Sequence, residues 1–316
     1  GPHHDDNGGQ LDDVKITAGV GNSTFDVSNA QTAVISAVSG SSTFNVLAAA
    51  SPTANASVTN GNGNSVYSVY GYADATVTSG NGNSNYNVIA GDLVALHAAS
   101  PALFGDLLGL VLGGLDNLDL GELIEDAGLA LDDLLVLTRP SAANIVAGDG
   151  NNVFNVLDFN ITGDGEANIT VGDGESRFNV ASNEVNITKG DGDSEFYIGG
   201  VTLGLPPLLT RMSEANIVAG DGDNTFHVAV GGLEIGLLAG LIGGGSGDSD
   251  LLAIAGGRAS IVTGDGDNRF EIVGADLSVT AGNGNNSIFA GVADSLSSPI
   301  AGSDELPSAI NVVVGN

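Results

Sequence analysis

The chain of 316 residues contains no cysteine and no tryptophan, and its lysines and arginines together number only 7. Without cysteine, a disulfide framework, a thiolate metal site and a cysteine nucleophile are all excluded. Because cationic side chains are so few, the sequence offers no basic surface for nucleic acid. No stretch reaches the roughly 18 uninterrupted apolar residues of a transmembrane helix, so we expect no membrane insertion.

Acidic residues and glycine are abundant instead. Aspartate and glutamate total 38, which gives a formal net charge of -31, and glycine numbers 49. Such a charge calls for cations, and it would repel anionic membranes and acidic polysaccharides unless a cation bridged them. The partner class that the composition favours is therefore cationic.

One stretch, IVAGDGDNTFHV at residues 217–228, recurs along the chain as a strand, an acidic glycine turn and a second strand. Adjacent copies are close: 19 residues separate Phe25 from Phe44, and 18 separate Phe178 from Phe196. Repetition at a fixed period predicts a solenoid. This period is too short for three strands but sufficient for two strands and two turns. We therefore predict an all-β fold, a parallel two-sheet β-roll or β-solenoid of about 18–19 residues per coil and about 11 coils. Further copies occupy residues 16–27, 35–46, 58–69, 77–88, 145–156, 169–180, 187–198, 261–272 and 279–290.

Alternation along each strand assigns its inward and outward side chains. In the strand after the turn, Phe226 and Val228 should point inward, whereas Thr225 and His227 should point outward. Stacking the coils then builds one interior file of aromatic rings, each contributing roughly 1.5–3 kcal/mol by burial. The predicted file consists of Phe25, Phe44, Tyr67, Tyr86, Phe154, Phe178, Phe196, Phe226 and Phe270.

The turns bring carboxylates of successive coils to about the 4.8 Å spacing of neighbouring strands, where like charges repel. Carboxylates, Asn carbonyls and turn carbonyls are the hard oxygen ligands that suit calcium, and two stacked turns could share one ion. The alternative is a solvated acidic turn that binds nothing. The predicted metal ligands form a first acidic row, Asp149, Asp173, Asp191, Asp221 and Asp265, and a second acidic row, Asn151, Glu175, Asp193, Asp223 and Asp267.

These turns resemble the calcium-binding repeats-in-toxin family, whose β-roll consensus is G-G-x-G-x-D-x-U-x, with U a large apolar residue. Residues 219–227 read A-G-D-G-D-N-T-F-H, which places Gly220, Gly222 and Phe226 on the second glycine, the third glycine and the apolar position. The resemblance implies calcium as cofactor and folding outside the cell, in secreted or cell-surface bacterial proteins. The chain departs from the family at its calcium-binding Asp, which is replaced here by Asn152, Ser176, Ser194, Asn224, Asn268 and Asn286.

We divide the chain into four parts. Residues 1–14 are predicted to be a disordered tail, 15–90 Asn-rich coils, 91–141 a Leu-rich helical insertion, and 142–316 Asp-rich coils. The last part has a second apolar insertion at 230–258, and the array is predicted to continue beyond 316. The Asn-rich coils carry Asn62, Asn64, Asn81 and Asn83 where the others carry carboxylates, so calcium should concentrate in the acidic half.

Both insertions follow the strand after a turn, so they should emerge from the edge opposite the acidic turns. Ser100-Pro101 is typical of a helix start, and Leu103 and Leu107 then share one face. The insertions could form a helical lobe packed on the roll, an interface for self-association or for a partner, or a site for an apolar ligand.

No catalytic residue is predicted, and we expect a protein without enzymatic activity. His97 and His227 are the only histidines outside the N-terminal pair, and His227 has no fixed Ser or Asp partner in the sequence. We predict a secreted calcium-binding structural or adhesive module of the adhesin, surface-layer or matrix type, with calcium and a cell-surface glycan as partners.

Two other functions stay open. One is a calcium-dependent polysaccharide-active enzyme, which needs a basic or Tyr/His constellation over a sheet face. The other is ice binding by an outward rank of Thr and Asn on the strands before the turns, although Thr and Val also have ordinary strand propensity. This rank includes Thr17, Thr59, Thr78, Thr170, Thr188 and Thr280, interrupted by Val146, Val218 and Val262.

Overall fold

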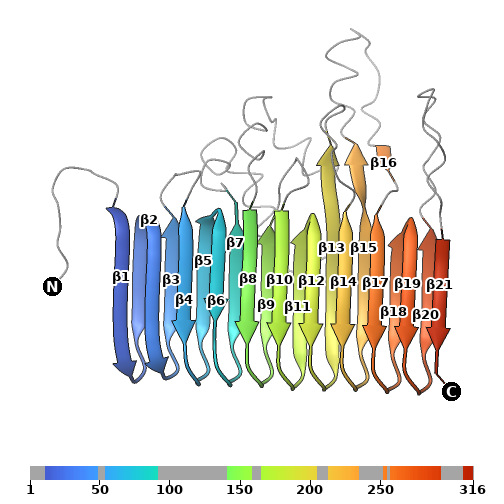
Figure 1. Cartoon of the computed structure of the whole chain (residues 1–316), viewed down its shortest axis with the longest axis horizontal. Coiled ribbons are helices and arrows are strands. Elements are labelled where there is room, and N and C mark those ends of the chain that lie inside the picture. Colours follow the sequence, from blue (N-terminus) through green and yellow to red (C-terminus); the bar gives the residue numbers. More distant parts are fainter. Residues whose placement is uncertain are drawn as a thin grey trace, which may run out of the picture.

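The computed structural model describes residues 11–48, 54–91, 141–158, 165–204, 213–234, 252–254, 257–292 and 309–315. Within these ranges the protein is all-β, with parallel strands stacked into an elongated solenoid, as Figure 1 shows. The described part of the chain has no helix that could span a membrane. The predicted all-β solenoid is therefore confirmed.

Alternate strands form two parallel series, because each coil contributes one strand before its acidic turn and one after it. The pre-turn series consists of β1 (Leu11–Val20), the second half of β2 (Thr24–Ser39), β4 (Asn55–Asn60), β6 (Asp74–Thr78), β8 (Ser141–Ala147), β10 (Gly165–Val171), β12 (Glu184–Lys189), β14 (Glu214–Ala219), β17 (Arg258–Thr263), β19 (Asp276–Ala281) and β21 (Ala309–Val314). The post-turn series consists of the first half of β2, β3 (Thr43–Ala48), β5 (Val66–Tyr72), β7 (Asn85–Ala90), β9 (Val153–Asp158), β11 (Ser176–Ser182), β13 (Ser194–Gly204), β15 (Thr225–Glu234), β18 (Arg269–Gly274) and β20 (Ser287–Val292).

Strands within a series pair in the register of the sequence copies. Phe178 pairs with Phe154 on one side and with Phe196 on the other. Equivalent residues of adjacent coils lie 18 or 19 positions apart where nothing is inserted. The insertions change this separation without shifting the register, because the inward pattern of each strand fixes its pairing.

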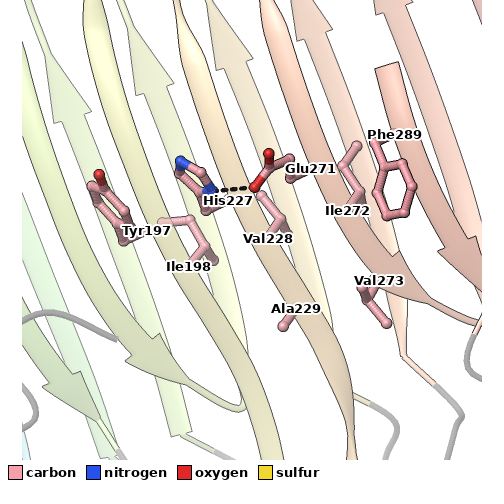
Figure 2. A pocket seen from close by; sticks show the side chains of 9 residues that line it. All are labelled: Tyr197, Ile198, His227, Val228, Ala229, Glu271, Ile272, Val273 and Phe289. Carbon is pink, nitrogen blue, oxygen red and sulfur yellow. Dashed lines mark ion pairs between the residues drawn. The ribbon is translucent and has the colours of Figure 1, made fainter. Parts of the chain in front are cut away.

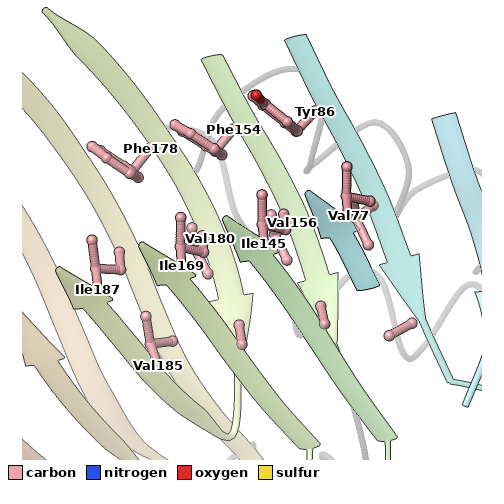
Figure 3. Packing of buried hydrophobic residues seen from close by; sticks show 14 of the residues in the cluster. Val77, Tyr86, Ile145, Phe154, Val156, Ile169, Phe178, Val180, Val185 and Ile187 are labelled. Carbon is pink, nitrogen blue, oxygen red and sulfur yellow. The ribbon is translucent and has the colours of Figure 1, made fainter. Parts of the chain in front are cut away.

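The core consists of the inward side chains of both series. All nine residues of the predicted aromatic file are buried, and neighbouring rings stack with centroids 4.6–5.0 Å apart and planes within 3–12° of parallel. Figure 3 shows Tyr86, Phe154 and Phe178 following one another, with Ile145 and Ile169 of the pre-turn series in the same cluster. The predicted inward and outward assignment is thus confirmed.

The boundaries of the predicted parts differ in detail. Strand β1 begins at Leu11, four residues before the predicted start of the coils at Lys15. Most of the two insertions lies outside the described residues, so helices there stay a prediction. Where the second insertion is described, it is strand: β15 continues to Glu234 and pairs antiparallel with β16 (Leu252–Ile254). Gly91 and Ser141, the first and last residues of the predicted first insertion, lie at strand ends away from the acidic turns.

Candidate functional site

The acidic turns line one long edge of the solenoid, where tight loops join each pre-turn strand to its post-turn strand (Figure 1). The second glycine of each acidic turn has a backbone conformation, and a close backbone neighbour, that leave no room for a side chain. Gly222 has φ 144°, and a Cβ there would lie 2.7 Å from the backbone carbon of Gly192 in the previous coil. All ten predicted ligands are exposed at this edge. The structure therefore gathers the two predicted rows side by side.

In the first acidic row, every side chain caps the backbone of the next coil. Oδ1 of Asp149 accepts from the N–H of Asp173 at 3.0 Å, and Oδ1 of Asp173 accepts from the N–H of Asp191 at 2.8 Å. The same bond links Asp191 to Asp221 at 2.9 Å and Asp221 to Asp265 at 2.8 Å. Each carboxylate thus satisfies a turn donor that has no strand partner.

The second acidic row follows the same rule with one exception. Asp193 accepts from the N–H of Asp223 at 2.8 Å, and Asp223 accepts from the N–H of Asp267 at 2.7 Å. Asn151 likewise accepts from the N–H of Glu175 at 2.9 Å. Glu175, which is one methylene longer, gives Asp193 no such cap, so the row is interrupted there.

The caps use one oxygen of each carboxylate, and the second oxygen accepts from a side-chain amide of a neighbouring coil in Asp149, Asp265 and Asp267. No described residue donates a hydrogen bond to Oδ2 of Asp173, Asp191 or Asp221. A shallow hollow of about 440 Å³ lies along the second acidic row and is lined by Glu175, Asp193 and Asp223, among others. Within the described ranges, however, no three histidine, aspartate or glutamate side chains converge to hold one metal ion. The donor set suits hard cations that bridge successive coils, and it does not form an enclosed cage.

At the C-terminal end of the rows, hydrogen bonds favour the charged form of the carboxyls. The backbone N–H and the side-chain amide of Asn283 hold the pKa of Asp265 below its ordinary value, and Asn285 does the same for Asp267. These two carboxylates therefore stay ionised at lower pH than free aspartate.

Lys189 supplies a positive charge beneath the first acidic row. Its side chain points inward, and only 3% of the residue is exposed. The Nζ donates to the carbonyl oxygens of Gly190 at 3.1 Å and Asp191 at 2.8 Å. Burial lowers the pKa of Lys189, while the carboxylates of Asp173, Asp191 and Asp149 act in the opposite direction. Lys189 was not among the predicted site residues, although its inward position follows from the strand alternation.

The positions that align with the calcium-binding Asp of the repeats-in-toxin consensus are buried in most coils here, and the backbone uses their side chains. Oγ of Ser194 accepts from the N–H of Ser176 at 3.2 Å, and Oδ1 of Asn268 accepts from the N–H of Asn224 at 3.0 Å. This inner ladder needs a side-chain oxygen but no charge. The uncharged residues at these positions thus have a structural explanation.

The capping role of the carboxylate rows was not predicted from the sequence, which indicated only mutual repulsion. The signal was present, because Asn62, Asn64, Asn81 and Asn83 occupy the same positions in other coils. Aspartate and asparagine share Oδ1, and Asn62 and Asn64 cap the next coil as the aspartates do. A position that accepts either residue therefore indicates a capping oxygen.

His227 has an acidic partner that the sequence did not reveal. Its Nδ1 lies 2.9 Å from Oε2 of Glu271, which occupies the neighbouring strand at the paired position. The second insertion separates the two residues in sequence, and only the strand register brings them together.

Comparison with models of protein families, with curated proteins and with solved structures finds no match to this chain.

Proposed function

We propose that this chain is a secreted or cell-surface structural module, a two-sheet β-roll of the adhesin, surface-layer or matrix type, whose acidic edge associates with calcium. The observation that carries the proposal is the pair of acidic rows, whose members stand in register on successive coils. An elongated solenoid with one strongly acidic edge is suited to bear load or to present a surface.

Repulsion along the rows is the physical reason for a cation. Neighbouring carboxylates one strand spacing apart repel by about 1 kcal/mol per pair even at the dielectric constant of water. The capping bonds position these charges without removing them, because a backbone N–H carries no net charge. Lys189 neutralises only its own part of the first acidic row.

Calcium at this edge would use the free Oδ2 atoms of successive coils, for example those of Asp173, Asp191 and Asp221, and water would complete its shell. Sites of this kind are exposed and shared between neighbours, so we expect weak binding at extracellular concentrations. Ions that bind only the folded edge stabilise it by mass action, by RT ln(1 + [L]/Kd) for each site. Folding would then be coupled to export into a calcium-rich medium.

Calorimetric titration with calcium tests the proposal directly. The matched variant is the triple change Asp173→Asn, Asp191→Asn, Asp221→Asn, which keeps the capping oxygens and removes three charges. We expect the wild type to bind calcium and the variant to lose most of that binding while its fold is unchanged by circular dichroism. Equal titrations for the two proteins, or no binding by the wild type, would refute a calcium-binding edge.

Ice binding is the second candidate, and one observation favours it. The outward rank on the pre-turn series is exposed and in register, with Thr170 and Thr188 paired on neighbouring strands. Next to it, Asn168, Asn186 and Asn216 form an amide ladder with bonds of 3.0 Å. Val146 and Val218, each 47% exposed, interrupt the hydroxyls. A freezing-hysteresis assay decides: activity lost on changing Thr170 and Thr188 to Lys supports this function, and no activity excludes it.

A further inference from the structure

The outward face of the post-turn series changes character near its C-terminal end. One file of this face begins as an amide ladder, in which Asn155 donates to Asn87 and Asn179 donates to Asn155, each at 2.8 Å. The register then continues through Tyr197, His227, Glu271 and Phe289. Figure 2 shows these four side chains on neighbouring strands. The repeat alone does not require them, because asparagine serves the same position elsewhere.

The imidazole of His227 is held from both sides. The ring of Tyr197 stacks on it at 4.9 Å and 8° from parallel, and Nδ1 pairs with Oε2 of Glu271 at 2.9 Å. Its Nε2 has no partner among the described residues. An oriented polar group without a partner is prepared to bind a ligand, because little side-chain entropy is left to lose.

Two arginines complete the cluster. The guanidinium of Arg177 lies 4.9 Å above the ring of Tyr197, and Arg269 donates to the other oxygen of Glu271. The whole chain has only 7 cationic residues, so two of them beside one histidine and one glutamate is a local concentration. Nε of Arg177 also lies 4.0 Å from Oε2 of Glu195, so two guanidinium groups face two carboxylates and formal charge is balanced here, whereas the turn edge is strongly acidic.

An apolar hollow of about 540 Å³ accompanies the file. Its lining includes Phe289, which is 72% exposed, Val273, which is 42% exposed, and Ala229 in the next outward file. The hollow thus offers apolar surface beside the fixed imidazole and runs across strands β13, β15, β18 and β20.

We propose that this hollow binds a neutral oligosaccharide. Sugars present apolar C–H faces and hydroxyls together, which match Phe289 and Val273 on one side and Nε2 of His227 on the other. A site of this shape is open and elongated rather than enclosed, as a chain of sugars requires. The net charge of -31 disfavours acidic glycans.

This site gives the proposed adhesive role a binding surface, and it shares no residue with the acidic edge. Calcium binding at the edge and oligosaccharide binding in the hollow can therefore be refuted independently of each other. Loss of calcium binding in the triple Asn variant should leave oligosaccharide binding intact, provided that the variant stays folded.

The test uses cellohexaose, chitohexaose and xylohexaose as neutral probes and hexagalacturonate as the anionic control, measured by saturation-transfer NMR and calorimetry on the full chain. His227→Phe keeps the stacking ring and removes Nε2, and Phe289→Ala removes the apolar wall. The matched control is Val218→Ala, at an apolar residue that is 47% exposed on the pre-turn face. Circular dichroism verifies that each variant is folded.

We expect at least one neutral probe to bind, each of the two site variants to weaken it at least tenfold, and Val218→Ala to leave it unchanged. Failure of all three neutral probes to bind, equal affinity in the site variants, or preference for hexagalacturonate would overturn the proposal.

Discussion

Oδ1 of Asp191 accepts a hydrogen bond from the backbone N–H of Asp221 in the next coil, at 2.9 Å. One side chain therefore does two things: its Oδ1 caps a backbone donor, and its charge adds to the acidic edge. Asparagine keeps the first property and loses the second, so substitution can separate structure from cation binding.

Changing Asp221 to Asn and to Ala tests this separation. In the absence of calcium, Asp221→Asn should be at least as stable as the wild type, because the cap on Asp265 is kept and repulsion falls. Asp221→Ala should lose about 0.5–1.5 kcal/mol, the usual contribution of one hydrogen bond. Denaturant unfolding with chelator present measures both. Equal loss in the two variants would contradict the capping role.

Glu175 is the one member of the second acidic row that does not cap the next coil. Glu175→Asn should place an oxygen where Asn151 and Asp193 place theirs, satisfy the N–H of Asp193, and raise the free energy of unfolding by about 0.5–1.5 kcal/mol. Thermal melting of the single variant checks it. Glu175→Gln, which removes the same charge but keeps the longer side chain that does not cap, is the control, and an equal gain there would contradict the argument.

The buried carboxyl of Asp158 should make the stability of the fold depend on pH. Burial raises its pKa to about 7, opposed by hydrogen bonds from Ser141 and from the N–H of Glu166, and the carboxylates of Glu166 and Asp74 raise it further. The folded state thus binds this proton more tightly than the unfolded chain. Its contribution to stability is complete below the ordinary pKa of 3.8 and is lost as pH rises through about 7.

The comparison variant is Asp158→Asn, which is neutral at every pH. Between pH 4.5 and 8 the wild type should lose stability relative to this variant. Only the change of this difference in unfolding free energy with pH matters, whatever its size at one pH. Urea unfolding across this range gives the profiles. Parallel profiles would show that Asp158 does not titrate in the folded state.

The aromatic file predicts that truncating a phenylalanine inside it costs far more stability than truncating a phenylalanine on the outer face. Phe178 stacks between Phe154 and Phe196 and is fully buried, so Phe178→Ala should cost about 3–5 kcal/mol. Phe289 is 72% exposed at the outer face, and Phe289→Ala should change stability by no more than about 0.5 kcal/mol. Chemical denaturation of both variants provides the measurement. Similar losses would contradict the assigned faces.

The periodicity of the sequence predicted those features of the fold that every coil repeats. The coil length, the inward file from Phe25 to Phe270 and the edge that carries the turns all follow from copies in register, because one coil imposes its alternation on the next. Features that occur once were not predictable. The pairing of His227 with Glu271 depends on a register maintained across the second insertion, and the strand pairing of β15 with β16 lies in a segment for which helix was predicted.

Chemistry was harder to predict than topology for a different reason. The sequence showed carboxylates in rows, but whether each row binds a cation or caps a backbone depends on where Oδ1 points. Asp149 and Asp173 show that it points at the next coil. Lys189 was likewise one of a few scattered cations until its ammonium was placed under the turn.

Thermal unfolding followed by circular dichroism, in millimolar calcium and then in excess chelator, tests the central claim most directly. The comparison protein carries Asp173→Asn, Asp191→Asn and Asp221→Asn. The account predicts that calcium raises the midpoint of the wild type, that chelation reverses the rise, and that the variant responds much less. A midpoint for the wild type that is the same with and without calcium would contradict it, and the acidic rows would then be capping groups alone.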